Sequence, residues 1–570
     1  MDKEFAYIID ASSSRGLTAQ LKDYNLTEDV ATNSLIIIEG AKRKYLGLIA
    51  EIFHSSGSDR ASELAKQLAK EGESRRIAEA TIKTYSNLGK FSTAFLIIPL
   101  AQTIKNSVEE VDTIPVHESR IYLPKEKDIE NFYGKIDNKT NWGIGYTKHA
   151  IKDLDSKVKI PINIELITRG SFGIFGKSGT GKTHLGNILA SLIILTNRFH
   201  DQNKKTKLLI FDMHSEYGLK VKDMQGNDYA DGVGLLFRND FKIYTPDSTL
   251  AKEFGLEEFT IDPKDFTIED IEILKENLNL SDAFIDYLGS YKRIINHIFE
   301  KDTVLKDEIY KKDSSWILYL LGFFEDREDF EKRRSHLEPK IEEEIQRLGT
   351  GALQSFRSGK ARLSQLKRYE FLNPNKKDCV KEIIEELFKG ERSIIISFGR
   401  YGDDARVYTL IAHLLSKKIW QKAISDIMEG KQLKYKVIIF LEEAHKFLSG
   451  ELYYKTAFGN IARELRKRGI VLGIIDQRPS QIHEDVLAML WNYFIFTLTS
   501  EKDIEACTRG LKFQSLFIPV ISNLKRKETL VYGEAIKLPA ILSIIDYKEF
   551  TKEIKEYYEK SLLKIDIPGY

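Results

Sequence analysis

The sequence predicts an α/β protein: a mainly parallel sheet covered by helices, preceded by a small β-barrel, interrupted by a helical bundle and followed by a short helix. Two observations carry this prediction. Short apolar runs typical of buried strands recur in the second part of the chain, and helical stretches follow most of them. A segment rich in Glu, Lys, Leu and Ile at helical spacing then breaks this alternation. The strand-like runs are residues 172–175, 207–211, 393–398, 437–441, 470–475 and 493–498.

The first region, residues 1–122, reads as strands. SLIIIEG, YLGLIAEIF and TAFLIIPL are short β-branched or aromatic runs, and a polar helix-like stretch over 59–86 lies between the last two. We expect a small β-barrel or sandwich with a helical insertion. It holds no nucleophile with a matching base, so partner docking or assembly is the better interpretation. Residues 123–160 are charged and predict a linker.

The α/β core is expected in two parts, residues 161–259 and 391–545. Residues 260–390 between them predict the inserted helical bundle, whose charged faces are typical of solvated helix surface. The tail, residues 546–570, predicts an amphipathic helix. This helix either braces a neighbouring subunit or caps its own core.

Composition limits the function. The 570 residues carry a net charge of only +1, so a nucleic-acid surface must be local. The chain has 2 cysteines, which excludes a cysteine-rich zinc module and suits a reducing compartment. The N-terminus lacks an apolar signal core, and no apolar run is long enough to span a bilayer. We therefore expect a cytoplasmic protein without a membrane anchor.

The motif Gly-x-x-x-x-Gly-Lys-Thr lies between a strand-like run and a helical stretch, in FGIFGKSGTGKTHLGNILAS. Its glycines allow positive φ and inward-facing amides, which together with a helix N-terminus make a phosphate site. Lys182 is placed to reach the β- and γ-phosphates, and the Thr183 hydroxyl to bind magnesium. A Gly-rich turn that merely joins strand to helix would have to supply these positions by accident. We assign nucleotide binding to Gly176, Lys177, Ser178, Gly179, Thr180, Gly181, Lys182, Thr183 and His184.

Two carboxylates end the apolar run of KVIIFLEEAHKFL. Glu442 is placed to hold the magnesium shell, and Glu443 to orient and deprotonate the attacking water. The alternative is an ordinary Glu-Glu pair at the start of a helix, but the phosphate loop upstream favours the catalytic interpretation. Gln477, after the next strand in IIDQRPSQI, is placed to sense the γ-phosphate or align water, although a structural role is also open.

A basic helix is expected in IARELRKRGI. Its arginines either complement the helix dipole or, in the functional alternative, serve the γ-phosphate of an adjacent subunit. FDMHSEYG adds Asp212 and His214 after the second strand, but no cluster has metal-ligand spacing.

These motifs in this order resemble the HerA family of ring-forming DNA-pumping ATPases. The segments are GKSGTGKTHL, FDMHSEYG, FLEEAHKFL, IARELRKRGIVLGIIDQRPSQI and LVYGEAIKLPAILSI. The resemblance implies a RecA-like core that hydrolyses ATP with Mg²⁺, a HAS-type barrel over 1–122 and a C-terminal brace. It also implies a homohexamer that threads double-stranded DNA through its pore.

The resemblance also selects one arginine. Where the family motif usually reads Arg-Glu-Gly-Arg-Lys-Phe-Gly, this chain has Leu465 and Arg468 in place of the first glycine and the phenylalanine, and keeps Arg466. Arg466 is therefore the candidate that acts in trans. Arg169, just before the strand of the phosphate loop, is a possible contributor in cis.

The resemblance further implies a partner that docks on the barrel. One hypothesis is a NurA-like nuclease in DNA-end processing. The second is an ATPase subunit of an anti-phage defence complex with a sirtuin-like NADase or nuclease. The third is a ring scaffold in which hydrolysis is secondary, which the intact Glu442, Glu443 and Gln477 disfavour. A secretion pump is disfavoured because no membrane anchor is expected. For DNA contacts in the pore, the turn over 400–406 and the loop over 447–459 are candidates.

Overall fold

The structure is a computed structural model of the 570-residue chain. It describes residues 4–23, 26–56, 91–105, 107–148, 150–151, 158–200, 205–223, 225–302, 315–323, 328–450 and 452–562. The helix-like stretch expected over 59–86 lies outside these residues. The chain divides into two compact units, one formed by Met1–Phe199 and Gly473–Tyr570, the other by His200–Leu472. No helix among the described residues is long and apolar enough to cross a membrane.

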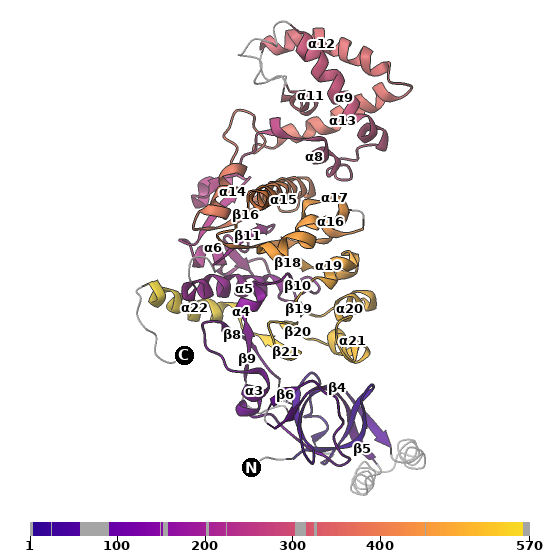
Figure 1. Cartoon of the computed structure of the whole chain (residues 1–570), viewed down its shortest axis with the longest axis vertical. Helices are drawn as coiled ribbons and strands as arrows, with labels where there is room; N and C mark the ends of the chain where they lie inside the picture. Colours follow the sequence, from indigo (N-terminus) through magenta and orange to yellow (C-terminus); the bar gives the residue numbers. More distant parts are fainter. Residues whose placement is uncertain are drawn as a thin grey trace. The chain divides into compact units, whose positions relative to one another are not determined.

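The first unit begins with a closed antiparallel barrel (Figure 1). Six strands form a continuous sheet that closes because β2 pairs with both β1 and β5. Alternate side chains point inward and fill the interior with fully buried residues such as Ile8, Ile36 and Phe95. The barrel strands are β1 (Ala6–Ser12), β2 (Gly16–Leu21), β3 (Leu35–Glu39), β4 (Lys44–Ser56), β5 (Phe91–Ile104) and β7 (Arg120–Tyr122), and β6 (Ser107–Glu109) pairs with β5.

The same unit contains a mixed sheet centred on β10 (Phe172–Phe175). This strand pairs in parallel with β18 (Ile470–Asp476) on one side and with β19 (Asn492–Ile495) on the other. Beyond β19 the sheet continues with antiparallel strands: β20 (Glu528–Gly533), β21 (Ala540–Ile544), β8 (Asn141–Tyr146) and β9 (Lys159–Asn163). Helix α5 (Lys182–Thr196) follows β10, and α22 (Tyr547–Leu562) packs beside α5.

Residues 123–160, which the sequence predicts to be a linker, contain α3 (Glu126–Tyr133) and the sheet strand β8. Asp137 starts the turn before β8, since its carboxylate accepts the amides of Lys139, Thr140 and Asn141, each at 2.8 Å. These hydrogen bonds hold the pKa of Asp137 at about 2 despite the opposing effect of burial. Only part of β8 faces the interior, so the run carries too few apolar residues for its composition to mark it as a strand.

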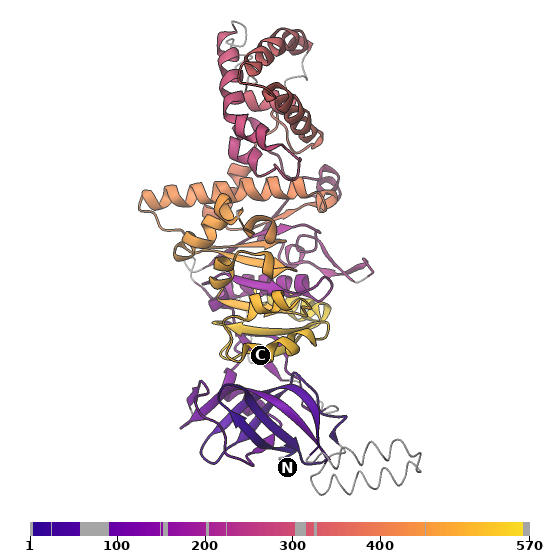
Figure 2. The same cartoon turned by 90° about the vertical axis from the view of Figure 1, so that its right-hand side faces the viewer.

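The second unit contains a parallel sheet. Its strands follow the order β15 (Glu257–Glu258), β14 (Phe241–Thr245), β16 (Ser393–Ser397), β11 (Thr206–Asp212) and β17 (Lys436–Glu442). Every residue of β11 and β16 is buried, as expected of strands covered on both faces. Helix α14 (Val380–Lys389) precedes β16 in the chain, and α15 (Ala405–Met428) follows it. In Figure 2, α15 is the long orange helix of this unit. The predicted fold class, an α/β core with an N-terminal barrel, is confirmed, although β14 was not predicted.

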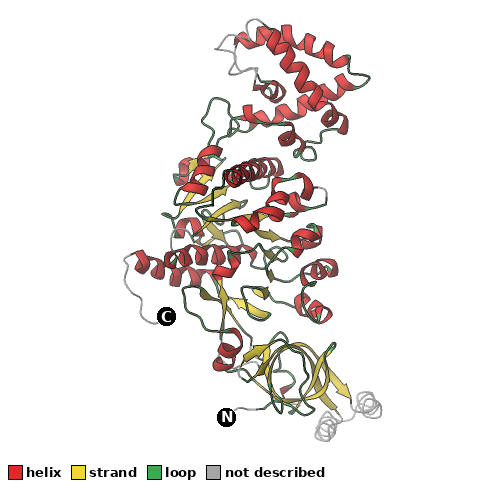
Figure 3. Ribbon diagram, in the orientation of Figure 1, coloured by secondary structure: helices red, strands yellow, loops and turns green. Residues whose placement is uncertain are grey.

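The expected insertion is present as a helical subdomain. Figure 3 shows helices joined by loops in this part of the chain. Its interior is aromatic, since the ring of Tyr291 lies 5.7 Å from that of Phe284 and 5.1 Å from that of Phe356. The helices are α8 (Ile268–Glu272), α9 (Asp282–Lys301), α11 (Trp316–Leu321), α12 (Glu328–Gln346) and α13 (Ala352–Leu363).

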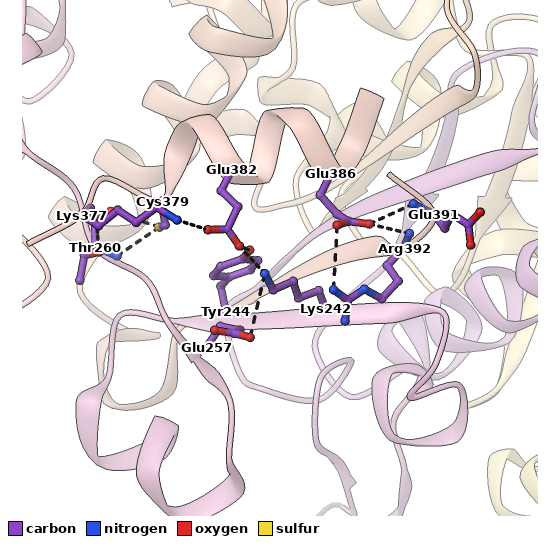
Figure 4. Close-up of polar contacts among 10 residues, drawn as sticks. All are labelled: Lys242, Tyr244, Glu257, Thr260, Lys377, Cys379, Glu382, Glu386, Glu391 and Arg392. Atoms are coloured by element: carbon purple, nitrogen blue, oxygen red, sulfur yellow. Dashed lines mark hydrogen bonds and ion pairs between the residues drawn. The ribbon is translucent and has the colours of Figure 1, made fainter. Parts of the chain in front are cut away.

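The two chain segments that join the insertion to the sheet are hydrogen-bonded to each other (Figure 4). The Thr260 amide donates to Sγ of Cys379 at 3.2 Å, and the thiol donates back to the Thr260 carbonyl at 3.1 Å. Next to them, Glu382 of α14 accepts from Lys242, Lys377 and Tyr244. The hydrogen bonds from Lys242 and Lys377 lower the pKa of Glu382 to about 2. The insertion therefore leaves and rejoins the sheet at one fixed point.

Candidate nucleotide site

The phosphate loop has the backbone that its glycines predict. The φ angles are +153° at Gly176, +73° at Gly179 and +120° at Gly181, a region that L side chains rarely adopt. Space is a second constraint at Gly176, where an added Cβ would lie 2.6 Å from Cβ of the fully buried Phe496. The ring of Phe496 also lies 3.3 Å from the point where a Gly181 Cβ would be, so Phe496 contacts the loop at both of these glycines.

The loop presents donors without acceptors. Its base is tied down, since the amides of Gly176 and Lys177 donate to the carbonyls of Asp476 and Thr497 at 3.2 and 3.1 Å. Past this point the amides are open. Within the residues that the structure describes, no acceptor meets the backbone amides of Ser178, Gly179, Thr180, Gly181 and Thr183. Because α5 begins at Lys182, the helix dipole adds positive potential at the same place, and the arrangement suits an anion.

Lys182 lies across the loop. Its Nζ donates to the carbonyls of Gly176 at 2.7 Å and Lys177 at 2.8 Å, which holds the ammonium group beside the open amides. Thr183, the next residue of the first helical turn, is half-buried. The ring of His184 stacks on Tyr547 of α22 at 5.6 Å, so His184 also joins α5 to the C-terminal helix.

Gln477 lies at the same edge of the first unit's sheet as the phosphate loop. Phe175, the residue before the loop, pairs with Asp476 in the parallel register of β10 and β18. Gln477 follows Asp476 directly, so it starts beside Gly176. The structure thus brings together two predicted site elements that are almost 300 residues apart in the sequence.

In the second unit, Glu442 ends β17 and Asp212 ends the neighbouring strand β11. Both side chains are nine-tenths or more buried. Asp212 accepts the amides of Glu216, Tyr217 and Gly218 at 2.9, 3.1 and 2.7 Å, yet burial still raises its pKa to about 7. Burial, reinforced by the charges of Asp212 and Glu216, raises the pKa of Glu442 well above its usual value. This edge therefore has a strong electrostatic preference for a cation.

Glu443 has a left-handed backbone, with φ of +49°. Glutamate rarely adopts this conformation, whose strain is on the order of 1–3 kcal/mol and is concentrated at functional sites. The turn ends β17 and sets the direction of the Glu443 side chain relative to that of Glu442. Glu443 is less buried than Glu442, and its Oε2 lies 3.7 Å from Nδ1 of His445.

These residues have the chemistry that Mg²⁺ requires. A hydroxyl from Thr183 and a carboxylate from Glu442 are hard oxygen ligands, and Mg²⁺ in nucleotide sites takes few protein ligands and keeps waters and phosphate oxygens. Among the described residues, no group of three or more His, Cys, Asp or Glu is arranged as a metal site.

The segment that carries Arg466 lies at the amino end of β17, whereas Glu442 lies at the carboxyl end of that strand. The Arg466 segment is a π-helical turn (η8, Ile461–Leu465) followed by a 3₁₀ turn (η9, Arg466–Arg468), not the regular helix that the sequence predicts. The Val437 amide donates to the Gly469 carbonyl at 2.8 Å, which fixes this turn at the amino end of β17. Glu442 is five residues further on, roughly 17 Å at the rise of a strand. An arginine side chain does not extend so far.

Arg169 and both arginines of the turn over 400–406 are paired with carboxylates. Arg169 forms an ion pair with Glu165 at the amino end of β10, away from the phosphate loop. Arg400 lies 3.6 Å from Asp247 and 3.4 Å from Glu370. Arg406 pairs with Asp404 at 3.0 Å. The pairs of Arg400 and Arg406 reduce the positive charge of the turn over 400–406.

The structure places two residues beside predicted site residues that the sequence had not connected with them: Asp212 beside Glu442, and Arg526 beside Gly179. Asp212 was noted only as part of FDMHSEYG, and the pairing of β11 with β17 brings it to Glu442. Arg526 was not noted. Its Nε donates to the carbonyl of Gly179 at 3.2 Å, from a segment 347 residues away. The basic run NLKRKE before β20 was the only signal in the sequence.

A Gly-x-x-x-x-Gly-Lys-Thr loop between a buried parallel strand and a helix, with open amides, defines a P-loop nucleotide-binding protein of the α/β class. The family model for the helicase HerA central domain matches residues 149–419. The resemblance to the HerA family is therefore confirmed.

Its similarity to curated relatives extends over the full length. The chain is 22% identical to the DNA double-strand break repair helicase HerA of Sulfolobus acidocaldarius over 589 aligned positions, covering 99% of each chain. It is 34% identical to the HerA helicase of Pyrococcus furiosus over 120 residues, 20% of this chain and 22% of that one. The plasmid coupling protein TrwB with a GTP analogue aligns over 68% of this chain and 88% of its own, at 14% identity and a TM-score of 0.43.

Proposed function

We propose that the protein hydrolyses ATP with Mg²⁺ and uses the energy to move duplex DNA. The observation that carries the first half is the set of open amides at Ser178–Gly181 and Thr183 beside the Lys182 ammonium, a site built for the phosphates of a nucleotide. The similarity to HerA helicases supports the second half.

In this proposal each motif has one task at a single nucleotide. The loop amides bind the α- and β-phosphates, and Lys182 reaches the β- and γ-phosphates. Thr183 and Glu442 hold the metal ion, which neutralises charge on the phosphates. Glu443 orients and deprotonates the attacking water, and Gln477 senses the γ-phosphate. A cation beside Glu442 would also lower its raised pKa and keep its carboxylate ionised.

We further propose that the chain works as a homohexamer in which Arg466 of one subunit serves the nucleotide of the next. The turn that carries it is held at the amino end of β17, roughly 17 Å from Glu442 along the strand, which supports a role outside its own carboxylate edge. The partner, a nuclease or a defence effector, would dock on the N-terminal barrel. DNA would be held through its phosphates, because a net charge of +1 leaves only a local basic surface.

Lys182→Ala and Glu443→Gln test the ATPase. We expect Lys182→Ala to weaken ATP binding, and Glu443→Gln to retain binding and lose turnover, because only the second residue acts in the chemical step. Glu253→Gln, a change at an exposed acid of the same unit outside every motif, is the matched control and should leave the rate unchanged. A near-wild-type rate in Glu443→Gln would exclude its role as the base.

DNA binding is tested with duplexes of equal length and unrelated sequence. Their affinities should agree closely, and all should fall steeply as salt rises, because phosphate contacts release counterions. A strong sequence preference, or an affinity that ignores salt, would contradict the proposal.

A further inference from the structure

The turn before β20 forms one wall of the phosphate loop. The Lys527 amide donates to the Thr180 carbonyl at 3.0 Å, and Nε of Arg526 donates to the Gly179 carbonyl at 3.2 Å. The Lys527 backbone also lies 3.9 Å from the point where a Gly181 Cβ would be. The turn therefore contacts three successive residues of the loop, Gly179, Thr180 and Gly181.

The turn is held from several sides. Leu524 is buried, and the Lys525 amide donates to Glu528 at 2.8 Å. Glu528 is itself buried and pairs with Lys148 at 2.5 Å. Lys527 has a left-handed backbone, with φ of +65°, and its ammonium pairs with Asp546 at 2.6 Å. The position of Arg526 between these anchors is therefore determined by the fold.

Arg526 carries an exposed positive charge. Among the described residues, its guanidinium forms no ion pair with a carboxylate. This distinguishes it from Arg169, Arg400 and Arg406, which are all paired. A guanidinium has five N–H donors and stays charged at every relevant pH, so the one bond to Gly179 leaves most of its capacity open.

We propose that Arg526 is a nucleotide-binding residue supplied by the same subunit that holds the phosphate loop, and that it contacts the α- and β-phosphates. The inference rests on the proposed function, in that the loop binds ATP. Loop amides hold these two phosphates, whereas Lys182 covers the β- and γ-phosphates. Arg526 donates to the carbonyl of Gly179, whose own amide is one of the open donors, so its guanidinium lies next to the amide site. Arginine suits this place because its planar fork binds phosphate oxygens in pairs.

The test compares variants of the full chain in binding ATP, ADP and inorganic pyrophosphate, with pyrophosphate measured by competition. Arg526→Ala should weaken all three by about ten- to a hundredfold, the range for hydrogen bonds to charged groups. Arg526→Lys should recover part of the loss, because it keeps the charge but not the fork. Lys525→Ala removes an exposed charge from the neighbouring position and should stay within about twofold of wild type. In steady-state assays KM should rise in Arg526→Ala while kcat changes little.

Several results would overturn the inference. Unchanged ADP affinity in Arg526→Ala excludes the contact, and a loss confined to ATP places Arg526 on the γ-phosphate. A loss for ATP and ADP without a loss for pyrophosphate places it on the sugar or base. A fall in melting temperature with no recovery in Arg526→Lys marks a purely structural brace. If the wild-type chain binds no nucleotide, and Lys182→Ala changes nothing, the proposed function fails and this inference fails with it.

Discussion

Arg466→Ala should abolish ATP hydrolysis and leave ATP binding intact. The structure gives the reason, because the turn that carries Arg466 is fixed at the amino end of β17, about 17 Å from Glu442 at the other end. Such an arginine cannot reach the carboxylate edge of its own unit. If it instead serves the next subunit of a ring, its removal should lower kcat by about 10³- to 10⁵-fold, the effect of an arginine supplied in trans.

An experiment that mixes two inactive variants measures the action of Arg466 in trans directly. A ring with head-to-tail contacts joins the Arg466 face of one subunit to the nucleotide of the next. In an equal mixture of Arg466→Ala and Lys182→Ala subunits, about a quarter of the interfaces pair an intact Arg466 with an intact loop, so up to about a quarter of the wild-type rate should return. Mixing Arg466→Ala with the doubly substituted chain is the control and should restore nothing.

Two results would refute this reasoning. If native mass spectrometry shows that subunits exchange, yet the mixed rings recover no activity, Arg466 is not the residue that acts in trans. If isolated wild-type monomers hydrolyse ATP at the full rate, no residue is needed in trans.

Two further predictions concern the stability of the fold. Gly176→Ala should lower the free energy of unfolding by about 2–5 kcal/mol, because it combines an unfavourable φ with a clash against Phe496. Gly179→Ala, with open space around its Cβ, should lower the free energy of unfolding by only about 1–2 kcal/mol. Equal losses in thermal unfolding would contradict this geometry. Lys207 is 4% exposed and its Nζ has no hydrogen-bond partner among the described residues, and burial lowers its pKa from 10.5 to about 8. The unfolded chain therefore binds more protons between pH 8 and 10.5, so wild-type stability should rise with pH across that window. In urea unfolding, Lys207→Met should raise the free energy of unfolding by about 3 kcal/mol at pH 7, and this gain should disappear by pH 10.5. The exposed control Lys434→Met should change the free energy of unfolding by less than about 0.5 kcal/mol. A gain independent of pH would show that the charge is not the cause.

The sequence alone determined the parts of the site that are local. The phosphate loop is eight consecutive residues, so the strand before it, the glycines within it and the helix after it are all visible in one stretch. Glu442 and Gln477 were predicted by the same means, because each comes at the end of a buried apolar run, and each lies at the carboxyl end of its own strand in the structure. The barrel and the helical insertion were visible as changes of period along the chain.

The tertiary structure decided what depends on strand order and on contacts between distant segments. Asp212 meets Glu442 only because β11 pairs with β17, and no local pattern specifies that pairing. From the sequence alone no partner could be named for Arg169 or Arg400, and only the fold supplies the carboxylates that neutralise them. Arg526 reaches Gly179 across 347 residues because β20 follows β19 in the sheet. Residue type and spacing fix local conformation, whereas the neighbours that set a side chain's charge and contacts are fixed by packing across the whole unit.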